Sequence, residues 1–238
     1  MGERIEVLER FLKVPQRTRM FNFITISWNP VIGCLHNCKY CWAKRLAETK
    51  LSNLSKYKEG FKPKLIEKEL SRKFSSNEFV FVSSMGDLFG DWVPKEWILR
   101  VLNVIRSNKQ TYFLLLTKNP KRYLEFLDEI PENCILGATI ETNRDTSKIS
   151  KAPVPKLRVE AMRKISEQTN HILMVSIEPV MDFDLEEFVE EIKSINPYFV
   201  VIGKNSMDVR LPEPSAEKLV KFKSLLNDFT KVILKKGI

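Results

Sequence analysis

The stretch Gly33-Cys34-Leu35-His36-Asn37-Cys38-Lys39-Tyr40-Cys41 contains three of the four cysteines of this 238-residue chain. Their spacing is C-x3-C-x2-C, so the three thiols lie within eight residues. Thiolates are soft metal ligands, and three of them on one short loop can converge on a single metal centre. Three protein ligands are one fewer than a closed structural zinc site or a fully protein-ligated iron–sulfur cluster requires. The loop therefore predicts a metal centre with an open coordination position, which is typical of catalytic sites.

Tyr40 directly precedes the last cysteine, and together with Cys34, Cys38 and Cys41 it resembles the signature of the radical S-adenosylmethionine (radical SAM) enzymes. The resemblance implies that the three cysteines bind three irons of a [4Fe–4S] cluster. The fourth iron would bind the amino and carboxylate groups of S-adenosylmethionine (SAM), and Tyr40 would pack near its adenine. Further runs resemble a phage and prokaryotic subgroup of poorly defined function (DUF5131, Gp37/Gp68-type). They are Thr117–Pro120, Gly137–Glu141 and Ser176–Pro179, and with Ser27–Pro30 they extend the resemblance over about residues 22 to 205.

Short apolar runs alternate with helical stretches along the chain, which is typical of βαβ units and a parallel sheet. We predict strands at 21–27, 78–84, 111–117, 135–141, 172–177 and 198–202, with a candidate short seventh at 231–234. Helices are predicted at 40–51, 63–73, 94–107, 120–127, 156–168, 184–194 and 215–228. Radical SAM proteins share a partial TIM-type (β/α)6 barrel, and the strand count agrees with it. We expect an α/β fold in a single domain, residues 1–238, with residues 1–20 as an N-terminal helical extension.

Polar residues follow several predicted strands at their carboxyl ends, where barrel enzymes place their active sites. Such positions are held by Ser84, Lys118, Glu141, Asn143, Glu178 and Asn205. From the resemblance, the residues assigned to cofactor binding are Tyr40, Ser84, Gly86, Asp87, Lys118, Glu141, Asn143, Ser176 and Glu178. No side chain is assigned to catalysis on the substrate, which stays unknown.

Some of these residues have a specific implied role and an ordinary structural alternative. Gly86-Asp87 stands where the family has a Gly-Gly-Glu run that contacts the amino group of SAM, but Asp87 is also typical of a turn or a helix cap. Glu141 matches a polar group that contacts the ribose hydroxyls of SAM. Lys118 and Arg158 are candidates to pair with the SAM carboxylate or an anionic substrate, and a solvated surface position is the alternative for Arg158.

A zinc site completed by His36 or Cys134 is the alternative to the cluster. His36 lies between two ligand cysteines, where the backbone would strain to bring four groups around one ion. Cys134 begins a buried strand, where a free cysteine usually behaves as a small hydrophobic residue. We therefore expect His36 outside the ligand set and Cys134 in the core.

The formal net charge is +9, with 39 Lys and Arg against 30 Asp and Glu. A basic balance favours polyanionic partners, nucleic acid among them. It also fits a protein from a thermophile with a lysine-rich solvated surface, because Lys and Glu are abundant and Gln is rare. The sequence has no apolar window long enough for a membrane helix and no secretory core at its N-terminus, so we expect a cytoplasmic protein without a membrane partner.

The leading hypothesis is a radical SAM enzyme that reductively cleaves SAM to a 5′-deoxyadenosyl radical, which abstracts hydrogen from a substrate. This chemistry requires a low-potential electron donor as partner. Nucleic-acid modification or repair is a candidate reaction, because an incomplete barrel has an open side that can admit a large substrate. The alternative is a non-catalytic nucleic-acid-binding protein stabilised by zinc or an Fe–S cluster. The sequence does not indicate an oligomeric state.

Overall fold

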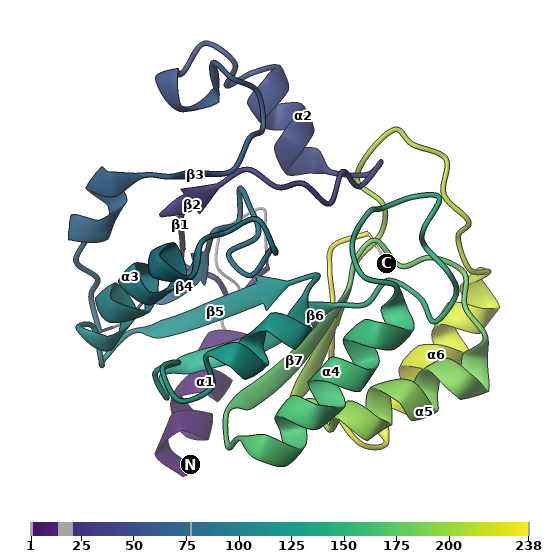
Figure 1. Ribbon diagram of the computed structural model, residues 1–238. Coiled ribbons are helices and arrows are strands. Elements are labelled where there is room, and N and C mark those ends of the chain that lie inside the picture. Colours follow the sequence, from purple (N-terminus) through teal and green to yellow (C-terminus); the bar gives the residue numbers. More distant parts are fainter. Residues whose placement is uncertain (1, 14–20, 77, 238) are drawn as a thin grey trace.

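Seven parallel strands form one sheet in the order β1-β4-β5-β6-β7-β8-β9 (Figure 1). The structure, a computed structural model, describes residues 2–13, 21–76 and 78–237. The strands are β1 (Ile26–Trp28), β4 (Phe79–Val82), β5 (Tyr112–Thr117), β6 (Cys134–Thr139), β7 (Ile172–Ile177), β8 (Phe199–Ile202) and β9 (Lys231–Leu234). Within the described residues, no pairing joins β1 to β9. The sheet is an open, partial barrel, as the sequence predicts, and 231–234 is its seventh strand.

Helices follow the strands and cover the outer face of the sheet (Figure 1). They are α3 (Lys95–Arg106), α4 (Pro155–Gln168), α5 (Leu185–Ile195) and α6 (Ala216–Asn227), with the 3-10 helix η3 (Pro120–Glu125) between β5 and β6. Each α-helix turns an apolar stripe towards the strands, and in α5 this stripe includes Phe188 and Ile192. Because all strands are parallel, their carboxyl ends meet at one edge of the sheet.

The two faces of the sheet have separate apolar cores, because side chains alternate along each strand. In β4, Val80 and Val82 pack with the outer helices, whereas Phe79 and Phe81 belong to the inner cluster. The inner cluster also contains Leu8 of helix α1 (Gly2–Lys13). Helix α1 lies at the amino ends of the strands, where Phe11 packs on Phe79 and on Tyr112. The opposite edge of the sheet is therefore left for a site.

A segment between β1 and β4 stands above the carboxyl edge of the sheet (Figure 1). Its elements are β2 (Val31–Ile32), α2 (Trp42–Glu48), the 3-10 turn η1 (Ser55–Tyr57), β3 (Lys64–Leu65) and the 3-10 helix η2 (Glu67–Ser71). Strands β2 and β3 pair antiparallel, with Val31 opposite Leu65. The helix predicted at 63–73 is wrong, because this pairing holds residues 64–65 extended and only a 3-10 helix follows.

Other boundaries differ from the sequence prediction by up to five residues. The strand predicted at 21–27 is β1, which begins only at Ile26 and ends at Trp28. The helix predicted at 120–127 is the shorter 3-10 helix η3. Of the predicted N-terminal extension, α1 ends at Lys13, and residues 14–20 lie outside the described residues. None of the described helices is long and apolar enough to cross a membrane.

Candidate active site

The cysteine loop begins at Gly33, whose position requires a glycine. Its φ of +80° lies in the left-handed region, and a Cβ atom there would stand 2.1 Å from the carbonyl oxygen of Lys62. The Gly33 amide donates to the carbonyl of Met85 at 2.9 Å. At Gly86, a Cβ atom would stand 3.0 Å from the Gly33 carbonyl oxygen. The start of the loop is thus fixed by close backbone packing on two sides.

The far side of the cysteine loop is held by the segment that follows β6. The Lys39 amide donates to the carbonyl of Ile149 at 3.0 Å, and the Lys151 amide donates to the carbonyl of His36 at 2.7 Å. The Ser150 hydroxyl lies 3.1 Å from the sulfur of Cys38. These contacts join two segments more than 100 positions apart in the sequence, so the fold itself sets the shape of the loop.

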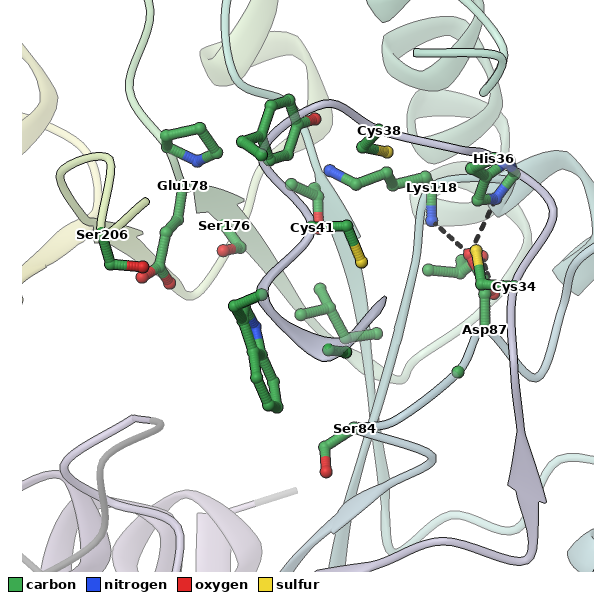
Figure 2. A pocket seen from close by; sticks show the side chains of 18 of the residues that line it. Cys34, His36, Cys38, Cys41, Ser84, Asp87, Lys118, Ser176, Glu178 and Ser206 are labelled. Atoms are coloured by element: carbon green, nitrogen blue, oxygen red, sulfur yellow. Dashed lines mark hydrogen bonds and ion pairs between the residues drawn. The ribbon is translucent and has the colours of Figure 1, made fainter. Parts of the chain in front are cut away.

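All three cysteines of the loop line one cavity of about 170 Å³ at the carboxyl edge of the sheet. Figure 2 shows Cys34, Cys38 and Cys41 around this space, with Lys118 near Cys38 and with Ser176 and Glu178 on the other side of Cys41. The predicted site residues that line it are Cys34, Cys38, Tyr40, Cys41, Ser84, Gly86, Asp87, Lys118, Ser176 and Glu178. Asn205, which follows β8, lines it as well. Residues from five segments of the chain therefore meet at this cavity, four of them at strand ends as the strand-end argument expects.

The three cysteines are free thiols and fit a three-thiolate cluster by the chemistry of the donor set. Burial raises the pKa of Cys34, and the nearby Asp87 carboxylate raises it further. Burial also raises the pKa of Cys41, against the lowering effect of the Lys44 amide. Thiols of this kind are protonated at neutral pH without a metal, so binding iron would release protons.

The zinc alternative has little support in the geometry. Among the described residues, no three His, Cys, Asp or Glu side chains are arranged to hold a single metal ion. His36 directs its Nε2 to Asp87 at 3.0 Å, and Cys134 is buried in the outer core cluster. A [4Fe–4S] cluster makes a different demand, because each thiolate binds a different iron.

Asp87 is fully engaged within the protein. Its Oδ1 accepts from the Thr117 hydroxyl at 2.7 Å and the Phe89 amide at 3.0 Å. Its Oδ2 accepts from His36 and from the Lys118 amide, both at 3.0 Å. Burial works against ionisation, but His36 and these donors together lower the pKa of Asp87. Asp87 therefore joins the cysteine loop to the end of β5, which matches its structural alternative better than free binding of an ammonium group.

Glu141 is the centre of a buried charged network beneath the cavity. It has no exposed surface, and its carboxylate accepts from the Tyr40 hydroxyl, from Lys118 Nζ, and from Arg158 Nη1, the last at 2.6 Å. Burial alone would raise the pKa of Glu141, but Arg158 and Lys118 outweigh it and lower the pKa to about 2. For Tyr40, burial and then Glu141 raise the pKa well above its usual value.

Arg158 is fully buried, so the solvated surface position considered for it is wrong. It also donates to the carbonyl oxygens of Pro153 and Thr139, at 2.6 and 2.7 Å. Its remaining nitrogen, Nη2, has no hydrogen-bond partner among the residues that the structure describes. Arg158 is the fourth residue of α4, which also contains Arg163, and nothing in the sequence indicated that it would pair with Glu141.

The structure does not bring Glu141 and Asn143 to the cavity wall. Glu141 lies behind Tyr40 and Lys118, as described above. Asn143 holds the start of α5, because its side chain accepts from the Asp184 amide at 3.0 Å and donates to the Asp184 carbonyl at 3.3 Å. Contact of either residue with SAM therefore stays a prediction of the sequence analysis.

Glu178 is paired with Lys235, which the sequence analysis did not assign to the site. Lys235 Nζ lies 2.5 Å from Glu178 Oε1, and Gly203 leaves room for the carboxylate, since a Cβ atom there would stand 2.8 Å from Glu178 Cδ. Lys235 directly follows β9, so the strand-end rule could have found it. Lys204 and Ser206, in the loop after β8, line the cavity as well.

Solved structures with the same fold include two proteins of very different sequence. Spore photoproduct lyase, complexed with dinucleoside spore photoproduct, matches with a TM-score of 0.62 at 10% identity, over 96% of this chain and 81% of that chain. SuiB of Streptococcus suis, bound to S-adenosylmethionine, matches with a TM-score of 0.57 at 10% identity, over 98% of this chain and 54% of SuiB. At such low identity the likeness shows the fold alone, which is a partial barrel.

Within that fold class, the family model described as "Protein of unknown function (DUF5131)" matches residues 18–210. The chain therefore belongs to the DUF5131 family. No curated protein matches it.

Proposed function

We propose that this chain is a radical SAM enzyme whose [4Fe–4S] cluster is held by Cys34, Cys38 and Cys41. One observation carries the proposal: three free thiols of one loop line the same cavity as polar residues from the carboxyl ends of the strands. Three thiolates leave one iron without a protein ligand, which is the arrangement that SAM binding requires. When bound, the reduced cluster supplies the electron that cleaves SAM to methionine and a 5′-deoxyadenosyl radical.

The chain's own residues position the cofactor and exclude water. Tyr40 is fixed at the cavity wall by Glu141, and Lys118 lies 5.2 Å from its ring centroid. We assign contacts with SAM to the wall residues Tyr40, Ser84, Gly86, Ser176 and Glu178. Phe21, Phe61, Phe81 and Leu116 add apolar surface to the same wall. An apolar wall limits the access of water, which protects a reactive radical.

Reductive SAM cleavage is the activity that tests the proposal. The protein is reconstituted anaerobically with iron and sulfide, then given dithionite and SAM, and 5′-deoxyadenosine is measured by mass spectrometry. We expect product from the wild type and none from Cys38→Ala, with Cys134→Ala as the matched control that retains it. A sample that binds a full cluster yet forms no 5′-deoxyadenosine would favour the non-catalytic binding protein instead.

Nucleic acid is the substrate class with the most support. The net charge of +9 favours a polyanion, and the spore photoproduct lyase of similar fold is complexed with a dinucleoside. Deuterium transfer from labelled oligonucleotides into 5′-deoxyadenosine would identify the donor of hydrogen. The physiological reductant is a low-potential electron donor, since the cluster must be reduced before SAM is cleaved.

A further inference from the structure

The positive charge of the chain is concentrated in one segment. Residues 39–73 contain eleven Lys and Arg against four Glu, which gives +7 of the total net charge of +9. The remainder of the sequence is almost balanced. We call residues 39–73 the basic flap; it comprises α2, η1, β3 and η2.

The cations of the basic flap are mostly not neutralised within the protein. Of its four acids, Glu59 lies 3.7 Å from Lys62 and Glu69 lies 3.6 Å from Arg72. Glu67 is bound instead by Arg100 of α3, at 2.9 and 2.5 Å. Seven cations of the flap are exposed and have no carboxylate within salt-bridge distance among the described residues: Lys39, Arg45, Lys50, Lys58, Lys64, Lys68 and Lys73.

The basic flap borders the candidate active site. Its residues Cys41, Trp42, Ala43 and Phe61 line the cavity, and Figure 1 shows α2 and β3 above the carboxyl edge of the sheet. Lys204, which is exposed, lines the cavity from the loop after β8. A polyanion on the flap would therefore lie across the mouth of the cavity.

We infer that the basic flap binds the phosphate backbone of a single-stranded nucleic acid and holds the strand over the cavity. Cations dispersed along a segment match a ligand with regularly repeated negative charges. Trp42, half-buried at the cavity wall, offers an aromatic face to an unpaired base. A cavity of about 170 Å³ is too small to admit a duplex, so a base brought to it must be unpaired.

Other partners fit the basic flap less well. A membrane surface is usually bound by a long amphipathic helix, but α2 has 7 residues and buries Ala43 and Ala47. A protein interface needs a dehydrated apolar centre, and the only large apolar side chain of the described flap that is exposed is Leu54. The inference rests on the proposed function, because the bound strand would be the substrate that donates hydrogen. Binding of the strand does not itself require SAM cleavage.

Two charge-matched variants of the cluster-loaded protein test the inference. The flap variant carries Lys50→Gln, Lys58→Gln, Lys64→Gln and Lys68→Gln. The control carries Lys109→Gln, Lys121→Gln, Lys164→Gln and Lys223→Gln, which are exposed positions outside the flap. Both variants lower the net charge equally. Fluorescence anisotropy of a labelled single-stranded oligonucleotide is recorded anaerobically over a range of salt concentrations, and circular dichroism confirms that both variants are folded.

We expect the wild type and the control to bind with the same steep salt dependence. If the four flap lysines contact phosphates, the flap variant should lose about 3 from the slope of log Kd against log salt, and at least about tenfold in affinity at low salt. Equal losses in the two variants, or no binding by the wild type, would overturn the inference. The inference would also be overturned if polyglutamate competed as effectively as the unlabelled strand, because that result would indicate an acidic protein partner.

The same samples separate this inference from the proposed function. Strand binding through the flap without any 5′-deoxyadenosine formation would remove the proposed enzyme and leave the binding surface. SAM cleavage by a protein that does not bind the strand would overturn this inference and leave the proposed enzyme.

Discussion

Arg158 and Glu141 form an ion pair inside the barrel wall, with Nη1 of Arg158 2.6 Å from Oε2 of Glu141 and neither side chain exposed. The pair joins α4 to the end of β6. Through Tyr40 and Lys118, the same carboxylate reaches the cysteine loop and the end of β5. One buried anion thus holds four segments in register behind the cavity.

Removing one partner of this pair should be costly. We expect Arg158→Met to lower the free energy of unfolding by about 3 to 5 kcal/mol, because it leaves Glu141 buried with only part of its compensation. Urea unfolding at neutral pH measures the change. Adding Glu141→Gln to Arg158→Met should cost less than the sum of the single changes. The exposed pair of Lys193 and Glu190, 3.9 Å apart, is the control, and Glu190→Gln should change stability by less than about 1 kcal/mol.

Glu191 on α5 should make stability depend on pH. Burial, together with the neighbouring Glu187, raises its pKa from 4.5 to about 7, and its Oε2 has no hydrogen-bond partner in the described part of the chain. The folded state therefore keeps a proton that the unfolded state loses, so stability falls as pH rises from about 4.5 to about 7.

Glu191→Gln removes this penalty, because the amide does not ionise. We expect the variant to be more stable than the wild type by about 1 to 2 kcal/mol above pH 8, after allowance for solvent screening, and nearly equal to it near pH 4. Thermal unfolding across this range measures the difference. A constant gain at every pH would show that ionisation is not the cause.

Gly33 and Gly60 form a matched pair for testing the cysteine loop. Both have positive φ, +80° and +75°, but a Cβ atom at Gly60 would meet nothing within 4 Å. Gly60→Ala should cost about 1 to 2 kcal/mol from the left-handed backbone alone. Gly33→Ala adds a collision with the Lys62 carbonyl, so it should cost more and reduce the iron bound per chain after reconstitution. Equal iron content in the two variants would contradict the steric account.

Removing iron should leave the barrel folded. The inner and outer apolar cores lie along the sheet and do not include the three loop cysteines. We therefore expect the chelated protein to keep its far-UV circular dichroism and its cooperative unfolding while losing SAM cleavage. Collapse of the fold on chelation would instead indicate a structural metal.

The strands were predictable because a parallel sheet covered on both faces leaves continuous apolar runs in the sequence. Residues 172–177 and 231–234 are predicted with the observed bounds. The short strands β2 and β3 were not, since residues 63–73 have a helical pattern and pair only through a partner more than 30 positions away. The local sequence pattern does not predict strand pairing that depends on residues far away in the sequence.

The candidate site shows the same division. Strand-end positions such as Ser176 and Glu178 reach the cavity because the fold class fixes where strand ends meet. The position of Glu141 depends on which way one side chain turns after the strand, and on Arg158, which comes from a helix. Sequence spacing contains neither fact, so the buried network could only be found in the structure.

The segment after β6 holds the cysteine loop mainly by main-chain hydrogen bonds, which are made by Ile149 and Lys151. Main-chain hydrogen bonds are indifferent to the identity of the side chains beside them. The exposed side chain of Lys151 is thus free to change while the sulfur atoms keep their places. Ile149, which is half-buried against the cluster of Cys38 and Tyr40, and Ser150, whose hydroxyl touches Cys38, are the exceptions. Part of the wall around the cysteines can therefore change in sequence without moving the three sulfur atoms.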